Sequence, residues 1–146
     1  MTLRRAADLL TAIRMVCGAI LAVRPSVAVL VVGVVSDWID GPLARRAGPT
    51  ERGARADLDA DSILTLGAAI GAVRCGAPRV VLIAPLAHYV VPSARSHDEV
   101  RWDRITGVAQ MLLLGATLMR LPIRWLATPV SAVRCAVLLA RVWRSR

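Results

Sequence analysis

Apolar runs recur along the whole chain, and short segments that contain Gly, Pro and Arg separate them. The separators lie at Arg24-Pro25, Gly48-Pro49, Gly76-Ala77-Pro78, Pro92-Ser93 and Leu121-Pro122. Because Gly and Pro interrupt or end helices, this punctuation predicts helices at residues 5–23, 25–45, 54–73, 78–93, 103–120 and 122–143. The expected fold is an all-α bundle that forms one domain over residues 1–146.

The composition indicates a membrane environment for this bundle. Hydrophobic residues make up 56% of the chain, and the mean hydropathy is +0.57. The segment Ile105–Met119, among the longest without a formal charge, has 15 residues, whereas a helix that spans a bilayer needs about 20. We therefore expect six transmembrane helices that carry their polar residues at one end or on a face buried in protein. A soluble, basic helical bundle is the alternative.

The arginines predict the orientation in the membrane. If six spans alternate, the side that holds both termini has twelve arginines and the opposite side has five. Since positive loops stay inside the cell, both termini are expected to be cytoplasmic in a multi-pass protein of the cell membrane. The basic N-terminus resembles that of a signal peptide, but Arg14 interrupts the apolar part, so we expect a retained first helix.

The net charge of +9 limits the choice of partners. The arginines are scattered between apolar runs and form no basic face with interleaved aromatic residues, so no nucleic-acid partner is expected. Anionic membrane lipids or a phosphate-bearing ligand fit the charge better.

Six of the ten acidic residues lie in one segment, SDWIDGPLARRAGPTERGARADLDADS, at residues 36–62. Asp37 and Asp40 are three positions apart, so they share a face near the end of the second predicted helix. Asp57 and Asp61 are four apart and share a face at the start of the third. A short loop makes these helices antiparallel neighbours, and the four carboxylates should converge.

Four like charges at a membrane edge repel one another, and divalent cations would relieve the repulsion. Oxygen ligands favour Mg²⁺ or Mn²⁺, and the lack of nearby His or Cys argues against zinc. Gly41, Ala44 and Gly53 would let a ligand approach closely, and Arg45 can donate to a phosphate. Asp59 is two positions from either acidic neighbour and should face elsewhere. The alternative is a solvated loop in which these acids pair with arginines.

The motif as a whole resembles that of a known family. The residues DWIDGPLAR at 37–45, followed by Gly53, Asp57 and Asp61, are similar to the signature DxxDGxxAR…GxxxDxxxD of the CDP-alcohol phosphotransferases, also called CDP-alcohol phosphatidyltransferases. The gap between Arg45 and Gly53 is one residue shorter than usual. The resemblance implies an integral membrane enzyme, usually a homodimer. Such enzymes transfer the phosphoryl-linked group of a CDP-activated alcohol, often CDP-diacylglycerol, to an acceptor alcohol in phospholipid biosynthesis and release CMP.

The resemblance also assigns roles to residues. It implies that Asp37, Asp40 and Asp57, helped by Asp61, hold two Mg²⁺ or Mn²⁺ ions. Asp61, the last acid and the deepest in its helix, is the candidate general base. The residues implied to line the CDP pocket are Asp40, Gly41, Ala44, Arg45, Gly53 and Asp57.

Two shorter patterns concern the acceptor. Thr11-Ala-Ile-Arg14 is similar to a Thr/Arg pair in the phosphatidylglycerophosphate synthases of this family. Arg104-Ile-Thr106, followed by Gln110, resembles a pattern that opens their fifth helix. Arg14, Arg104 and Thr106 are therefore the predicted acceptor-binding residues, and end-of-helix or bundle pairing is the alternative for the two arginines.

Two other functions remain open for the acid segment. A non-catalytic membrane protein that binds CDP-lipid or divalent metal would carry the same residues. A metal-ion transporter would also use intramembrane acids, but its ion path would be centred near the bilayer midplane rather than at one edge.

Overall fold

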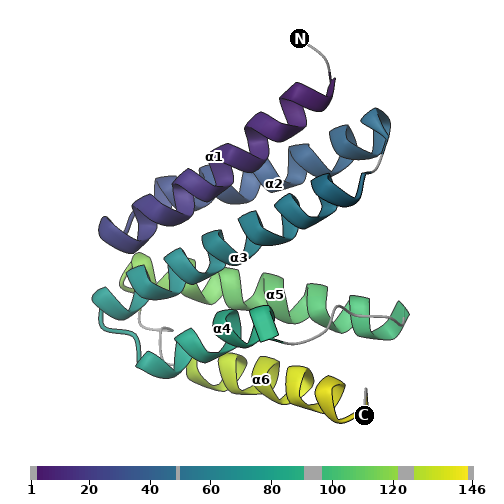
Figure 1. The fold of residues 1–146 in the computed structure, drawn as a ribbon. Helices are drawn as coiled ribbons and strands as arrows, with labels where there is room; N and C mark the ends of the chain where they lie inside the picture. The colour runs from purple at the N-terminus through teal and green to yellow at the C-terminus, as the bar shows by residue number, and fades with distance from the viewer. Residues whose placement is uncertain (1–2, 49, 91–96, 122–126, 145–146) are drawn as a thin grey trace. The chain divides into compact units, whose positions relative to one another are not determined.

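The computed structural model describes residues 3–48, 50–90, 97–121 and 127–144, without the side chains at 88–90, 97–106, 127, 128, 141, 142 and 144. The elements in these ranges are α1 (Leu3–Val23), α2 (Val27–Ala47), α3 (Glu51–Arg74), the 3₁₀ turn η1 (Arg79–Leu82), α4 (Ile83–Val90), α5 (His97–Leu118) and α6 (Ala127–Arg144) (Figure 1). No strand occurs in these ranges, so the predicted all-α class with six helices is confirmed.

The junction between α2 and α3 follows from local chemistry. Gly48 has φ +89°, a conformation that residues with a side chain rarely adopt, and it ends α2. Thr50 caps α3, because its hydroxyl oxygen accepts the backbone N–H of Gly53 at 3.2 Å. This cap starts α3 at Glu51, one turn earlier than predicted.

Helix α5 also begins earlier than predicted. It starts at His97, in the charged stretch between the helices predicted at 78–93 and 103–120, where a loop was expected. Asp98 and Glu99 fall in the first turn, where acidic residues favour helix formation through the helix dipole.

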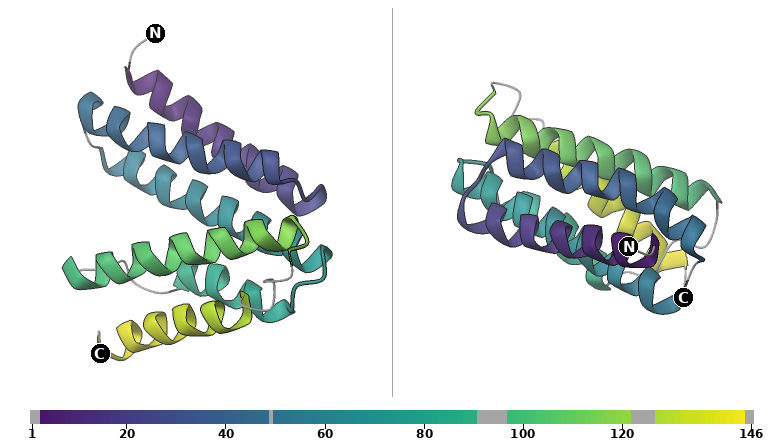
Figure 2. Two further views of the ribbon diagram at one scale, coloured as in Figure 1. Left: turned by 180° about the vertical axis from the view of Figure 1, so that it is seen from behind. Right: turned by 90° about the horizontal axis from the view of Figure 1, so that it is seen from above.

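The chain divides into two compact units, Met1–Gly71 and Ala72–Arg146. In the first unit, α1, α2 and most of α3 lie side by side, and short links make sequential helices antiparallel neighbours (Figures 1 and 2). The backbones of α1 and α3 touch at Gly18 and Gly67, because a Cβ on Gly67 would lie 2.0 Å from the Gly18 carbonyl oxygen. This close crossing brings the face of α1 that carries Arg14 toward α3.

The first unit buries charged side chains beside its apolar core and also exposes large apolar side chains. Arg14 is fully buried and Asp40 is 3% exposed, whereas Trp38 is 74% exposed and Val16 and Val32 are more than half exposed. Charged side chains are almost never fully buried unless they are paired. Helices α1 and α2 have 21 residues each, about 31 Å in length, and are long and apolar enough to cross a bilayer.

In the second unit, α6 packs on η1, α4 and α5. Its core includes Val81, Leu114 and Leu138, and it encloses one polar pair in which Arg134 Nη1 donates to Gln110 Oε1 at 2.6 Å. Helix α4 has eight residues, and η1 adds four, so this part is shorter than the roughly 20 residues that a span requires. The count of six spans stays a prediction.

Candidate active site

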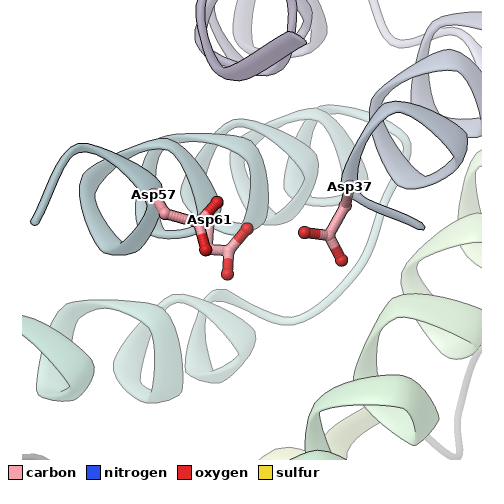
Figure 3. A group of neighbouring side chains, drawn as sticks. All are labelled: Asp37, Asp57 and Asp61. Carbon is pink, nitrogen blue, oxygen red and sulfur yellow. The ribbon is translucent and has the colours of Figure 1, made fainter. Parts of the chain in front are cut away.

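Helices α2 and α3 bring three carboxylates of the motif to one place. Oxygen atoms of Asp37, Asp57 and Asp61 lie within 4.8 Å of one another. Figure 3 shows the carboxylate of Asp37, on α2, directed toward that of Asp61, on α3. The helical spacing within each pair, together with the short α2–α3 link, accounts for this convergence.

The fourth carboxylate, that of Asp40, is set apart by its burial. Its side chain is 5% exposed, whereas those of the other three acids are 43 to 50% exposed. Asp40 Oδ2 accepts hydrogen bonds from Thr11 at 2.9 Å and from Arg14 at 2.8 Å. Asp40 Oδ1 is buried and has no hydrogen-bond partner among the described residues. A buried acceptor without a donor costs about 1–3 kcal/mol, so this oxygen is available to a cation.

Arg14, from α1, lies at the centre of the four acids, and its side chain is fully buried. Nη1 contacts Asp37 at 2.8 Å and also Asp61, while Nη2 contacts Asp40 and Asp57 at 2.8 Å each. One positive charge thus faces four negative charges. The sequence patterns assigned Arg14 to the acceptor site, and that role stays a prediction.

Thr11 contributes to the site in a way that sequence reasoning missed. It was recognised only as part of a pattern with Arg14, yet its hydroxyl reaches Asp40 directly. Thr11 and Arg14 are three positions apart and share one face of α1. That spacing was the available signal, but it could not identify which acid the face meets.

Apart from the buried Asp40, the predicted CDP-pocket residues of α2 are accessible. Ala44 and Arg45 are exposed, and Gly41 is half-buried. A Cβ on Gly41 would lie 3.4 Å from Arg45 Nη1, so the guanidinium covers this glycine. Gly53, in the first turn of α3 and one turn before Asp57, is exposed. Their contact with a nucleotide stays a prediction.

Asp59 is exposed and is not among the acids that pair with Arg14, in line with its expected outward orientation. Arg104 and Thr106 lie in α5, and their side chains fall outside the described residues.

The cluster has the chemistry of a site that could hold a divalent metal ion. Its donors are carboxylate oxygens, with neither His nor Cys in the group that could hold an ion within the described residues. Asp40 shares Arg14 with these three acids and brings a fourth carboxylate to the cluster, whose Oδ1 has no partner among the described residues. Hard cations such as Mg²⁺ and Mn²⁺ prefer such ligands, and zinc does not.

A family model agrees with the motif. The model for CDP-alcohol phosphatidyltransferase matches residues 4–133, which cover the acid cluster and most of the chain. The chain therefore belongs to the CDP-alcohol phosphatidyltransferase family, whose activity is the transfer of a phosphatidyl group from a CDP-alcohol. The match identifies the family and not a branch within it. No curated protein and no solved structure matches the chain.

Proposed function

We propose that this protein transfers the phosphatidyl group of CDP-diacylglycerol to an alcohol acceptor and releases CMP. The convergence of the four motif carboxylates on Arg14, with Oδ1 of Asp40 left without a partner among the described residues, carries this proposal. A CDP-lipid contains a pyrophosphate, which is negatively charged like the cluster. The two can meet only with cations between them, and a divalent metal site supplies these.

Asp37, Asp40, Asp57 and Asp61 would together hold two Mg²⁺ or Mn²⁺ ions. When bound, these ions would neutralise negative charge that develops on the departing CMP. Asp40 forms the buried floor of the site, since Thr11 fixes one of its oxygens. The other three acids are partly exposed and leave an open side for the substrate.

The reaction requires a base and an orienting pocket. Asp61 accepts the proton of the acceptor hydroxyl, and the hydroxyl oxygen bonds to the phosphorus that carries diacylglycerol. The bond from this phosphorus to the oxygen of CMP breaks, and CMP leaves. Gly41 and Gly53 allow the nucleotide to approach the backbone, and Arg45 donates to a phosphate oxygen.

The proposed setting is the cytoplasmic edge of the cell membrane, in a multi-pass homodimer. The apolar, exposed outer surface of α1 and α2 supports burial in lipid, and the excess of arginines on one predicted side supports the orientation. Arg14, Arg104 and Thr106 are proposed to bind a phosphorylated acceptor alcohol, as in the phosphatidylglycerophosphate synthase branch.

A matched pair of α3 variants tests the reaction. CMP release from CDP-diacylglycerol is measured in detergent with Mn²⁺ and a panel of acceptor alcohols. Asp61→Asn should lower the rate about 10²–10⁴-fold because the base is lost. Asp59→Asn removes the same charge from an exposed position on the same helix and should change the rate less than about twofold.

Two outcomes would contradict the proposal. Equal rates of CMP release for Asp61→Asn and Asp59→Asn would show that Asp61 is not the general base. Metal-dependent binding of CDP-diacylglycerol by the wild type, without CMP release for any acceptor, would favour the non-catalytic alternative.

A further inference from the structure

The guanidinium of Arg14 already supplies one positive charge to the acid cluster. Arg14 engages one oxygen of each of the four carboxylates. These acids are the same groups that would hold a divalent metal, so the guanidinium occupies the position where metal charge is needed. We propose that Arg14 and the divalent cation are alternative counter-ions of the cluster, so that Arg14 holds the carboxylates together without metal and leaves them when metal binds.

The inference rests on the proposed metal site. Electrostatics makes simultaneous occupancy unfavourable. The guanidinium is charged at every accessible pH, so it cannot adapt to an arriving cation by losing a proton. Two divalent ions would balance the four carboxylates without Arg14. A fifth positive charge at the centre would then repel the ions in a poorly solvated place.

The hydrogen bonds of Arg14 also indicate that its guanidinium can leave the carboxylates. Nη1 and Nη2 each contact two acids, but Nε is buried and has no partner in the part of the chain that the structure describes. A buried donor without a partner is unfavourable, so the arginine is not fully satisfied where it lies. Asp40 has a second anchor, the Thr11 hydroxyl, which stays in place if the guanidinium moves.

The movement requires the side chain and not the helix. Gly18, one turn after Arg14, is in backbone contact with α3, and a Cβ there would lie 2.5 Å from the Ile63 carbonyl oxygen. This contact fixes α1 against α3. The long Arg14 side chain can change rotamer while its Cα stays, and three of its four partners are partly exposed.

The test is the affinity for Mn²⁺, measured without nucleotide. Protein purified with Mn²⁺ is titrated with a chelator of known affinity, and free Mn²⁺ is followed by electron paramagnetic resonance. Starting from the loaded state avoids any need for a variant to fold without metal. Arg14→Gln should bind Mn²⁺ about tenfold more tightly or better, because a competing charge is removed. Arg14→Lys keeps the charge and should stay near the wild-type affinity.

Arg24→Gln is the matched control. It removes the same charge from an exposed position just after α1, and its Mn²⁺ affinity should change less than about twofold. A second readout is thermal unfolding, in which Mn²⁺ should raise the midpoint of Arg14→Gln more than that of the wild type.

Each result separates the two claims. Weaker or unchanged Mn²⁺ binding by Arg14→Gln, with normal binding by the wild type, would overturn the competition and leave the metal site intact. Absence of Mn²⁺ binding in the wild type, Arg14→Gln and Arg24→Gln alike would instead overturn the proposed metal site.

Discussion

Replacement of Thr11 by Val should weaken the metal site without disturbing the packing of α1. Valine has nearly the same shape as threonine but lacks the hydroxyl that donates to Asp40 Oδ2 at 2.9 Å. If metal binding displaces Arg14, this hydroxyl is the remaining side-chain donor to Asp40 among the described contacts. Its loss leaves the buried carboxylate without a fixed orientation.

The magnitude follows from the type of bond. A hydrogen bond to a charged group contributes about 1.5–3 kcal/mol, and a factor of ten corresponds to about 1.4 kcal/mol. Thr11 also lies 3.2 Å from the Ala7 carbonyl oxygen, but its single proton favours the closer, charged acceptor. The Mn²⁺ affinity should therefore fall roughly 10- to 100-fold, the range seen when partners of metal ligands are removed.

Two variants serve as controls for this measurement. Thr11→Ser retains the hydroxyl and should stay within about threefold of the wild-type Mn²⁺ affinity. Thr65→Val removes a hydroxyl that donates at 2.7 Å to the backbone carbonyl of Asp61, one turn away, and should change the affinity less than about twofold. Equal Mn²⁺ affinities for Thr11→Val and the wild type would refute the positioning role.

Two further predictions concern the helix crossing and the metal. Gly67→Ala should lower the free energy of unfolding by about 1–3 kcal/mol or more because its Cβ meets the Gly18 backbone. Gly107→Ala should not lower it, because a Cβ on Gly107 would lie 3.7 Å from Arg134 Nη1, an ordinary contact. Similar unfolding curves in detergent for both variants would contradict this prediction. Removal of divalent ions by a chelator should abolish CMP release, and excess Mg²⁺ or Mn²⁺ should restore it; a rate indifferent to the chelator would count against the metal site.

The acid cluster could be predicted because it depends on local rules. The spacing of Asp37 with Asp40 and of Asp57 with Asp61 sets one face on each helix, and a short link then brings the faces together. The place of Arg14 could not be predicted in the same way. It depends on a crossing at Gly67, far along the chain, and no local pattern identifies which acids the face of α1 meets.

Among the helices, the class and number were predictable and the ends were not. Gly and Pro separated the apolar runs correctly because they interrupt helices wherever they occur. The start of α3 depends on the cap at Thr50, and α5 extends through a charged segment that reads as a loop by hydropathy alone. The roles of Arg104 and Thr106, the single 1–146 domain and the number of spans remain predictions.

The proposed phosphatidyl transfer is tested most directly by CMP release from purified wild-type protein in detergent micelles. Labelled CDP-diacylglycerol is supplied with Mn²⁺ and, in turn, glycerol phosphate, inositol phosphate and a lipid alcohol. Stoichiometric CMP and one new phospholipid with a preferred acceptor are the expected products. Folded protein that binds Mn²⁺ but forms neither product with any acceptor would contradict the proposed transfer.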